Sequence, residues 1–515
     1  MENFPWLTTL ALVPLVGAIV IALMPERSEL TARKIGVVFS IVPVFLVVAM
    51  GLLFDANSAE PFQFTEEVPW IPSLGVSYSL GVDGIALVLL AMTVVLVPIV
   101  LIGGWHEGED SPTGASAKGY VALVLLLETC IIFVFAATDV FLFYVFFEVM
   151  LIPMFYLIGR YGGPQRQYAA MKFLIYSLLG GLFMLASLIG LYVTAARETG
   201  DPTFSVLALS DLSMDPNTQK MLFLGFFFAF AVKAPMVPFH TWLPDAAAEA
   251  KPGTSVLMVG LMDKVGTFGM IRLCLPIFPD ASAFYAPVII VVAVIGIIYG
   301  ALLAIGQTDM LRLVAYTSIS HFGFIVLGIF VFTTQSMSGA TLYMVTHGLT
   351  TAALLMLVGY LITRRGSKFI SDYGGVGKVA PVLAGLFLIS GLASVSLPGL
   401  GSFVSEFLVL LGTFTRYPWL AAFATLGVVL AAIYILWWYQ RAMTGPVKPE
   451  CEGMRDLGGR ETLAVAPAVV LLIAVGFFPQ LMLNDINPAV DRTMVSIGQT
   501  DPEPKVDAAT VGEAR

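Results

Sequence analysis

Charged residues, cysteines and histidines are scarce in this chain of 515 residues. Charged side chains make up 12% of the sequence, whereas they make up roughly 25% of a usual soluble domain. The three cysteines, Cys130, Cys274 and Cys451, lie far apart and match neither a disulfide framework nor an iron–sulfur spacing. The four histidines have no paired spacing that predicts a metal site. The composition therefore excludes a disordered chain, a nucleic-acid-binding protein and an ordinary cytosolic enzyme.

Long apolar runs fill the sequence instead, and hydrophobic residues make up 58% of it. A bilayer-spanning helix needs about 20 apolar residues, so we expect an all-α polytopic membrane protein with about 14 transmembrane helices. The first run follows Glu2 rather than a basic segment and is longer than the apolar core of a signal peptide, so we interpret it as a membrane helix. The expected spans lie near residues 4–24, 35–54, 83–103, 118–138, 140–159, 169–196, 219–243, 254–275, 284–305, 310–332, 337–363, 380–415, 418–440 and 462–483.

Two expected spans contain helix-breaking residues. Pro235 and Pro238 lie in the middle of the seventh, and Pro398, Gly399 and Gly401 lie in the middle of the twelfth. Such breaks are tolerated in a membrane where the freed backbone is buried in protein or lines a wet cavity. Because an odd number of spans separates the two breaks, the pattern is typical of an inverted repeat. We therefore predict an N-terminal part with three helices (1–117), two five-helix inverted repeats that each form a half-channel (118–275 and 284–444), and a last transmembrane helix with a polar tail (445–515).

The loops carry the remaining topological information. Most loop Lys and Arg residues follow odd-numbered spans, so the positive-inside rule puts both termini outside the cytoplasm. The segment from Asp55 to Leu80, which contains three prolines, is expected to be a long connection. The tail after Leu483 is rich in Asp, Pro and Thr, and we expect it to fray.

Ionisable residues inside the expected spans point to the chemistry. A charged group at the bilayer centre costs about 2.5–3.5 kcal/mol on insertion scales, so its presence indicates a function. We predict that six such residues transfer protons: Glu148, Lys233, Lys264, His321, His347 and Glu406. Two weaker candidates are His240, which follows the first break, and Glu128 in the fourth span.

Each candidate also has a structural interpretation. Glu148 is the expected partner of Lys233, and a Glu–Lys pair is either switched by moving one partner or serves as a fixed ion pair that braces the broken helix. Adjacent helical residues point about 100° apart, so we expect Lys264 to face the bundle interior and Asp263 to serve a local network. Ser318 and Ser320 before His321 are typical of a hydrated relay, although buried histidines are often only hydrogen-bonded.

One motif points to a different function. The segment 375–380 matches the pattern GxGxxA. That pattern binds a dinucleotide only between a strand and a helix of a βαβ unit. Here we expect a basic loop between two membrane spans, and no flavin motif, phosphate loop or nucleophile elbow is found, so we predict no redox centre in this chain.

Several long segments resemble a known family. FYVFFEVMLIPMF, KAPMVPFHTWLPDA, QTDMLRLVAYTSISHFGFIVLG, HGLTTAALLMLVGYL and LASVSLPGLGSFVSEFLVL are similar to the antiporter-like membrane subunits of respiratory complex I, over about residues 80–480. Glu406, where some relatives have Lys, favours the M branch, the counterpart of mitochondrial subunit 4. The resemblance implies that Glu148 and Lys233 are the charged pair of the first half-channel, that Glu406 is the terminal group of the second, and that a hydrated axis joins them through Lys264, His321 and His347.

The resemblance further implies a subunit of a proton-pumping NADH–quinone oxidoreductase in the bacterial plasma membrane. NADH, FMN, iron–sulfur clusters and quinone would belong to partner subunits, with no cofactor or metal in this chain. Expected partners are neighbouring antiporter-like chains, the lateral helix of one of them and the lipid bilayer, but no nucleic acid. Two departures are Ala247 and Ala248, where the family usually has a loop His, and the segment 251–254, which alters the family's APT. A subunit of a multi-subunit Na⁺/H⁺ antiporter, of a membrane hydrogenase or of a photosynthetic homologue stays open, as does a purely structural membrane spacer.

Overall fold

The structure, a computed structural model, describes residues 4–25, 28–200 and 202–503. Over these residues, eleven helices are long and apolar enough to cross a membrane, which confirms the expected all-α membrane protein. These helices are α1 (Trp6–Leu23), α2 (Glu29–Leu53), α3 (Gly84–Gly103), α4 (Ala117–Ala136), α5 and α6 together (Val140–Tyr161), α7 (Arg166–Thr199), α14 (Pro279–Ile305), α15 (Met310–Phe330), α16 (Thr334–Arg365), α20 (Pro418–Met443) and α21 (Gly459–Phe477).

Three further apolar segments are interrupted helices. They are α9 (Pro216–Lys233) with α10 (Trp242–Glu249), the run from α11 (Pro252–Ser255) through η3 (Val256–Met262), α12 (Lys264–Gly269) and η4 (Met270–Cys274) to α13 (Leu275–Ile277), and α18 (Pro381–Ser394) with α19 (Gly401–Arg416). The shorter elements are β1 (Gln63–Ile71), η2 (Pro72–Leu74), β2 (Val76–Val82), α8 (Val206–Ser210), η5 (Ile370–Asp372), α17 (Val376–Val379), η6 (Pro449–Cys451) and α22 (Gln480–Ser496). The count of 14 spans, the inverted repeat and the boundaries between the parts stay predictions.

The first break separates α9 from α10 around Pro235. A proline has no N–H to donate, so a carbonyl one turn earlier loses its helical partner. The indole of Trp242 donates instead to the carbonyl of Val232 at 3.0 Å, and the N–H of Met236 bonds the carbonyl of Ala231 at 2.9 Å. The break is therefore closed by protein groups, and α9 ends at Lys233.

The second break separates α18 from α19 and rests on two left-handed residues. Ser396 has φ 58° and Gly399 has φ 95°. A non-glycine residue rarely adopts such a φ, so the turn is held by its surroundings. The backbone carbonyl of Gly399 packs on Gly476 of α21, where an added Cβ would lie 2.3 Å from that oxygen.

The run from Pro252 to Ile277 contains two π-helical stretches, η3 and η4, which the sequence does not announce. A π-helix bonds each N–H five residues back, which widens the turn and is frequent at functional sites. The N–H of Asp263 accordingly bonds the carbonyl of Met258 at 3.1 Å. The run packs against α9 on one side and against α3 and α16 on the other, so it joins the two halves of the molecule.

The long connection expected from Asp55 to Leu80 contains the β1–β2 hairpin, which the sequence did not predict. The strands pair antiparallel from Gln63 opposite Val82 to Ile71 opposite Val76. Pro69 is compatible with β1 because a strand with an open edge does not need every N–H. Glu66 of this strand accepts the N–H of Leu7 at 2.7 Å and thereby caps the start of α1.

The expectation that the chain frays after Leu483 is wrong for residues 484–496, because α22 continues to Ser496. The helix buries Leu483, Ile486, Val490 and Met494, which recur at helical spacing on one face. That face packs on α3 and α16. The many Asp and Asn residues of the segment lie between these positions, which conceals the stripe. The rest of the expected tail, 504–515, and Glu2 lie outside the described residues.

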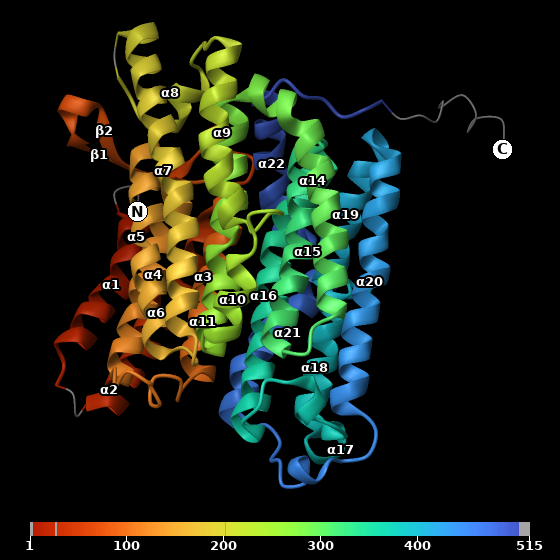
Figure 1. The fold of residues 1–515 in the computed structure, drawn as a ribbon. Coiled ribbons are helices and arrows are strands. Elements are labelled where there is room, and N and C mark those ends of the chain that lie inside the picture. Colours follow the sequence, from red (N-terminus) through yellow and green to blue (C-terminus); the bar gives the residue numbers. More distant parts are fainter. Residues whose placement is uncertain (1–3, 26–27, 201, 504–515) are drawn as a thin grey trace, which may run out of the picture.

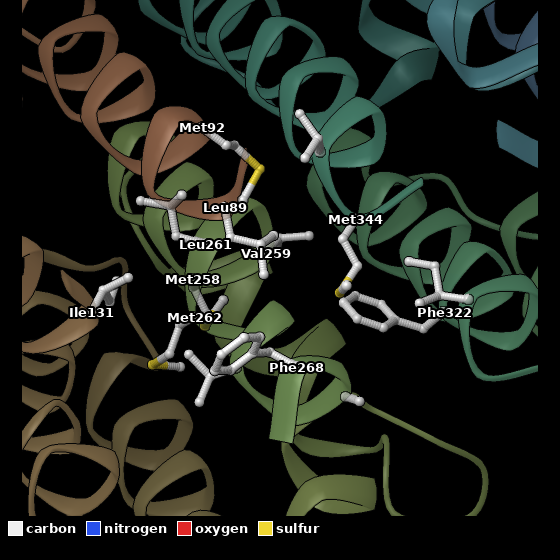
Figure 2. Packing of buried hydrophobic residues seen from close by; sticks show 14 of the residues in the cluster. Leu89, Met92, Ile131, Met258, Val259, Leu261, Met262, Phe268, Phe322 and Met344 are labelled. Carbon is white, nitrogen blue, oxygen red and sulfur yellow. The ribbon is translucent and has the colours of Figure 1, made fainter. Parts of the chain in front are cut away.

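Two groups of membrane helices stand side by side, as Figure 1 shows, with α1 to α9 in red to yellow and α14 to α20 in green to blue. Helix α16 is buried along almost its whole length and contacts α3, α15, α18, α19, α21 and α22. Figure 2 shows how apolar side chains from α3, the run 252–277, α15 and α16 converge between the two groups, among them Met92, Met262 and Met344.

The loops 104–116, 366–380 and 444–458 lie at one end of the helices, which we call the basic end. Lys368 joins Asp309 there at 3.0 Å, and Arg364 binds Glu461 at 2.5 Å. The motif at 375–380 forms the turn into α17 at this end, and within the described chain β1 and β2 form the one sheet. The segment is thus no strand–helix phosphate site.

Candidate functional site

Glu148 lies at the junction of α5 and α6. The helix is interrupted between α5 and α6 because Pro153 has no N–H to donate to the carbonyl of Val149, the last residue of α5. The carboxylate points at α7, where Gly181 leaves room for it. An added Cβ on Gly181 would lie 1.6 Å from Oε1 of Glu148. Glycine at this position therefore permits the carboxylate to enter the bundle.

Lys233 is fully buried at the end of α9. Its Nζ lies 5.0 Å from the ring centre of Phe147 and 5.7 Å from that of Phe173, close enough for cation–π attraction. Within the described part of the chain, the ammonium has no hydrogen-bond partner. The charges of Glu148 and Lys233 act on one another, so the structure brings the expected pair together without a direct hydrogen bond.

Lys264 begins α12 directly after the π-helical turn. Its Nζ donates to the carbonyl of Val259 at 2.5 Å and bonds Nδ1 of His347 at 2.7 Å. The carbonyl of Val259 belongs to the widened turn of η3. The ammonium also lies 5.1 Å from the ring centre of Phe322. Lys264 thus reaches from the joining run to α16, as expected for a residue that faces the interior.

Asp263 contributes more than the local network that the sequence predicted. It is fully buried, and both carboxylate oxygens lack a hydrogen-bond partner among the described residues. The charges of Lys264 and Lys233 both act on it. Asp263 therefore interacts both with Lys233 of the first half and with Lys264 of the centre. The spacing of residues along one helix does not reveal this.

His347 and His321 lie together in the centre of the bundle, 5.2 Å apart between ring centres. Nε2 of His347 bonds the hydroxyl of Ser318 at 2.9 Å. Ser320, the other serine before His321, bonds the carbonyl of Ile297 instead and takes no part in this contact. Nε2 of His321 faces the hydroxyl of Tyr434 at 3.5 Å.

One tyrosine that the sequence analysis missed, Tyr343, lies between the histidines and Glu406. The hydroxyl of Tyr343 donates to Oε2 of Glu406 at 3.0 Å, and its ring centre lies 5.8 Å from that of His321. Ser396, at the second break, also donates to Oε2 of Glu406. Tyr343 precedes His347 by one helical turn, which is the signal that could have found it.

The two weaker candidates lie apart from this line. Glu128 of α4 is 1% exposed, and no partner for its carboxylate is found in the described chain. His240 lies in the first break, with its ring centre 5.2 Å from that of Tyr299. Neither forms a hydrogen bond to the six main residues in the parts of the chain that the structure describes.

Asp245 of the LPD motif joins α10 to both halves. It accepts from Lys172 of α7 at 2.7 Å and from Arg312 of α15 at 2.5 Å. Partly buried ion pairs shared between three helices fix their relative positions more firmly than a single exposed pair. The far side of the first break is therefore held in place by residues from both groups of helices.

Gly181→Ala is expected to displace the carboxylate of Glu148 without unfolding the chain, because the atom in the way is the end of a flexible side chain. A misplacement of about 1 Å at a reacting group costs up to a hundredfold in rate, and we expect about a tenfold lower rate of proton translocation. The measurement is ΔpH formation in membrane vesicles, normalised to assembled complex. Gly385→Ala is the control, since an added Cβ there meets nothing within 4 Å. Equal rates in both variants would contradict the role of Gly181.

Comparison with known proteins gives a consistent picture. A family model described as "NADH:quinone oxidoreductase/Mrp antiporter, TM" matches residues 137–433. The chain is 53% identical to NADH-quinone oxidoreductase subunit M of Mycobacterium tuberculosis strain H37Rv, covering 98% of this chain and 97% of the relative. It is 36% identical to NADH-ubiquinone oxidoreductase chain 4 of Arabidopsis thaliana, covering 94% of this chain and 96% of the relative.

Solved structures agree with this. A chain of respiratory complex I from Thermus thermophilus with bound NADH matches with a TM-score of 0.87 and 31% identity, over 96% of this chain and 100% of that chain. A chain of the Mrp complex from Dietzia sp. DQ12-45-1b shares the fold, with a TM-score of 0.83 and 22% identity over 95% and 98% of the two chains.

The broken membrane helices and the buried line of carboxylates, lysines and histidines define an antiporter-like polytopic membrane subunit. The chain belongs to the family of membrane subunits shared by NADH:quinone oxidoreductases and Mrp antiporters. Within that family its similarity is higher to subunit M and chain 4 of the oxidoreductases than to the Mrp structure.

Proposed function

We propose that this chain is the M-type proton-translocating membrane subunit of a NADH–quinone oxidoreductase. The observation that carries the proposal is the direct bond between Lys264 and His347, at 2.7 Å, in the middle of a line of ionisable groups that joins the two broken helices. The names of the relatives, which are subunits of such complexes, support it. Moving one charge against 100 mV costs about 2.3 kcal/mol, so a line of this kind must be coupled to an energy source.

The first half of the line holds the proton on Glu148 or Lys233. Lys233 is fully buried against aromatic rings and Glu148 is partly buried, so the charge of each depends strongly on the charge of its partner. When Glu148 is protonated, Lys233 loses the anion that stabilises its ammonium. Lys233 then gives up its proton toward Asp263, because the charge of Asp263 acts on Lys233. Lys264 is the next group in the line, because its charge acts on Asp263.

The central step is a transfer from Lys264 to His347. Since Lys264 donates to Nδ1, neutral His347 carries its proton on Nε2 and donates to Ser318. Arrival of a proton on Nδ1 makes the imidazolium, and the proton on Nε2 then leaves. His321 takes up that proton through an intervening water or a rotation of the ring, since the two imidazoles are 5.2 Å apart between centres.

The terminal step brings the proton to Glu406. The hydroxyls of Tyr343 and Ser396 both point at its Oε2, so they stabilise the carboxylate before it is protonated. Beyond Glu406, Thr346 bonds Ser405 at 3.0 Å and Thr350 bonds Ser402 at 3.2 Å, which lines the contact of α16 with α19 with hydroxyls. The second break thus supplies both the acceptor and a polar wall for its hydration.

The same proposal covers placement in the cell and the division of the chain. The chain lies in a bacterial plasma membrane with the basic end in the cytoplasm and both termini outside it. Residues 118–275 and 284–444 act as two inverted half-channels, with 1–117 and 445–515 as flanking parts. The breaks at Pro235 and Gly399 lie in the two repeats and support this division.

Electron transfer belongs to other subunits in this proposal. NADH, FMN, iron–sulfur clusters and quinone would be bound there, and the present chain would contact neighbouring antiporter-like chains and the lateral helix of one of them. Copurification of the tagged full-length chain tests the assignment. NADH-oxidising, flavin-containing and iron–sulfur partners are expected, whereas partners limited to other antiporter subunits would favour the Na⁺/H⁺ exchanger that shares the fold.

A further inference from the structure

A cavity of about 210 Å³ opens at the basic end between α3, α16 and α21. Its lining includes Glu107 from the loop after α3, Lys251 before α11, and Tyr360 of α16. The volume is enough for several waters, since one water occupies about 30 Å³ of liquid. None of the proton-transfer residues described above lines it.

Glu107 forms the floor of this cavity on the side of α11. Its carboxylate accepts the N–H of Gly253 at 2.8 Å and the hydroxyl of Tyr120 at 2.8 Å. A larger residue than glycine would clash at position 253, because an added Cβ would lie 2.7 Å from Oε2 of Glu107. The carboxylate is therefore attached to the beginning of the run that carries Lys264.

Tyr360 supplies a second, independent sign of a ligand. The residue is 5% exposed, and no described residue gives its hydroxyl a hydrogen-bond partner. The hydroxyl points toward Gly103, another lining residue, where it would lie 2.7 Å from an added Cβ. A buried phenol that lacks a partner in a polar cavity requires water.

The charges around Glu107 suit the uptake of a proton. Burial raises the pKa of Glu107 above its ordinary value, because the charged form loses hydration. Lys251 opposes this shift, and the two bonds from Gly253 and Tyr120 do so as well. The other titratable or charged side chains that line the cavity are His106, Asp110, Arg460 and Glu461. They include groups of both signs.

The wall on the inner side of Tyr360 is apolar. Met356 lies one turn earlier on α16, lines the cavity and is 1% exposed. His347 follows further inward on the same helix, about 20 Å from Tyr360 at 1.5 Å per residue. A flexible methionine between a wet cavity and a buried polar line is suited to open and close a water path.

We propose that this cavity is a water-filled proton inlet for the central line, in which Glu107 accepts protons from the cytoplasm and Tyr360 passes them inward past Met356. The inference rests on the proposed function, because it supplies protons to Lys264 and His347. The proton on the carboxylic acid of Glu107 moves to water beside Tyr360, and the phenol exchanges one proton for another without net change.

The first test uses the full complex in inverted vesicles with NADH as donor, where the outer solution bathes the cytoplasmic side. Glu107→Gln keeps an acceptor for Gly253 but does not take up a proton, and we expect about tenfold slower ΔpH formation at unchanged assembly. Glu452→Gln is the control at the same end of the helices, since Glu452 is exposed and does not line the cavity. Wild-type rates for Glu107→Gln would overturn the inlet, while a wild-type complex that does not pump would overturn the proposed function itself.

A second test does not depend on the chemistry of Glu107. Thr363 lines the cavity and is exposed. Thr363→Cys is therefore expected to react with a bulky, hydrophilic thiol reagent. The labelled complex should pump about tenfold more slowly, because the label blocks the path to the acid–base group. Thr113→Cys, at the same end but outside the cavity lining, should react without effect. Full pumping after complete labelling of Thr363→Cys would exclude the cavity as an inlet.

Discussion

Replacing Lys233 by alanine is expected to abolish most proton translocation and to slow quinone reduction in the assembled complex. Loss of a positioned acid–base group lowers a proton-transfer rate by about a hundredfold or more. The lysine is fully buried between Phe147 and Phe173 and is the group on which the charge of Glu148 acts. The measurement is ΔpH formation per NADH oxidised in vesicles, together with the amount of assembled complex.

Two further variants separate a titrating lysine from a fixed cation. Lys233→Arg should also fail, because arginine does not release its proton in proteins. Lys220→Ala is the matched control, since Lys220 lies on the same helix over the ring of Phe284, at 3.9 Å, outside the buried line. Full pumping by Lys233→Arg would leave Lys233 as a structural brace of the broken helix.

Glu406→Gln is expected to slow proton translocation by about a hundredfold, since the amide keeps the shape of the side chain but carries no exchangeable acid proton. Oε2 of Glu406 is the acceptor for Tyr343 and Ser396, and the amide oxygen retains these bonds. Assembly should therefore stay near the wild-type level. Glu406→Asp should keep part of the activity because it keeps the acid, and ΔpH formation with NADH as donor measures both.

A control on the same helix distinguishes proton transfer from polarity alone. Thr413→Val removes a buried hydroxyl whose one bond to the described residues goes to the carbonyl of Val409 in α19, and it should pump normally. Glu406→Lys tests whether any titratable group suffices at this position. If Glu406→Gln pumps at the wild-type rate, Glu406 is not the terminal group, and the proton leaves elsewhere in the complex.

The fold follows from the sequence where one physical effect dominates. Apolar runs of about 20 residues predict membrane helices, since lipid offers no partner for the backbone. The breaks after Lys233 and before Gly401 were predicted because a proline or a glycine acts on its own turn. In contrast, α22 was missed because its polar residues outnumber the buried stripe, and only packing on α3 and α16 shows that the stripe is used.

The residues of the candidate site also fall into those that the sequence predicts and those that only the structure shows. Glu148, Lys233, Lys264 and Glu406 stand out in the sequence because a buried charge is costly and needs a reason. Tyr343 does not stand out, since a tyrosine in an apolar helix is ordinary, and it gains significance only from its bond to Glu406.

The sequence by itself determined that this protein spans a membrane, where its helices break, and which ionisable groups lie in its apolar segments. These properties depend on the transfer of single residues and single turns from water into lipid. The tertiary structure alone decided that Lys264 bonds His347, that Asp263 lies between two lysines, and that the π-helical turn at 256–262 supplies the carbonyl of Val259. These contacts join residues far apart in the chain, and their distances depend on how whole helices pack.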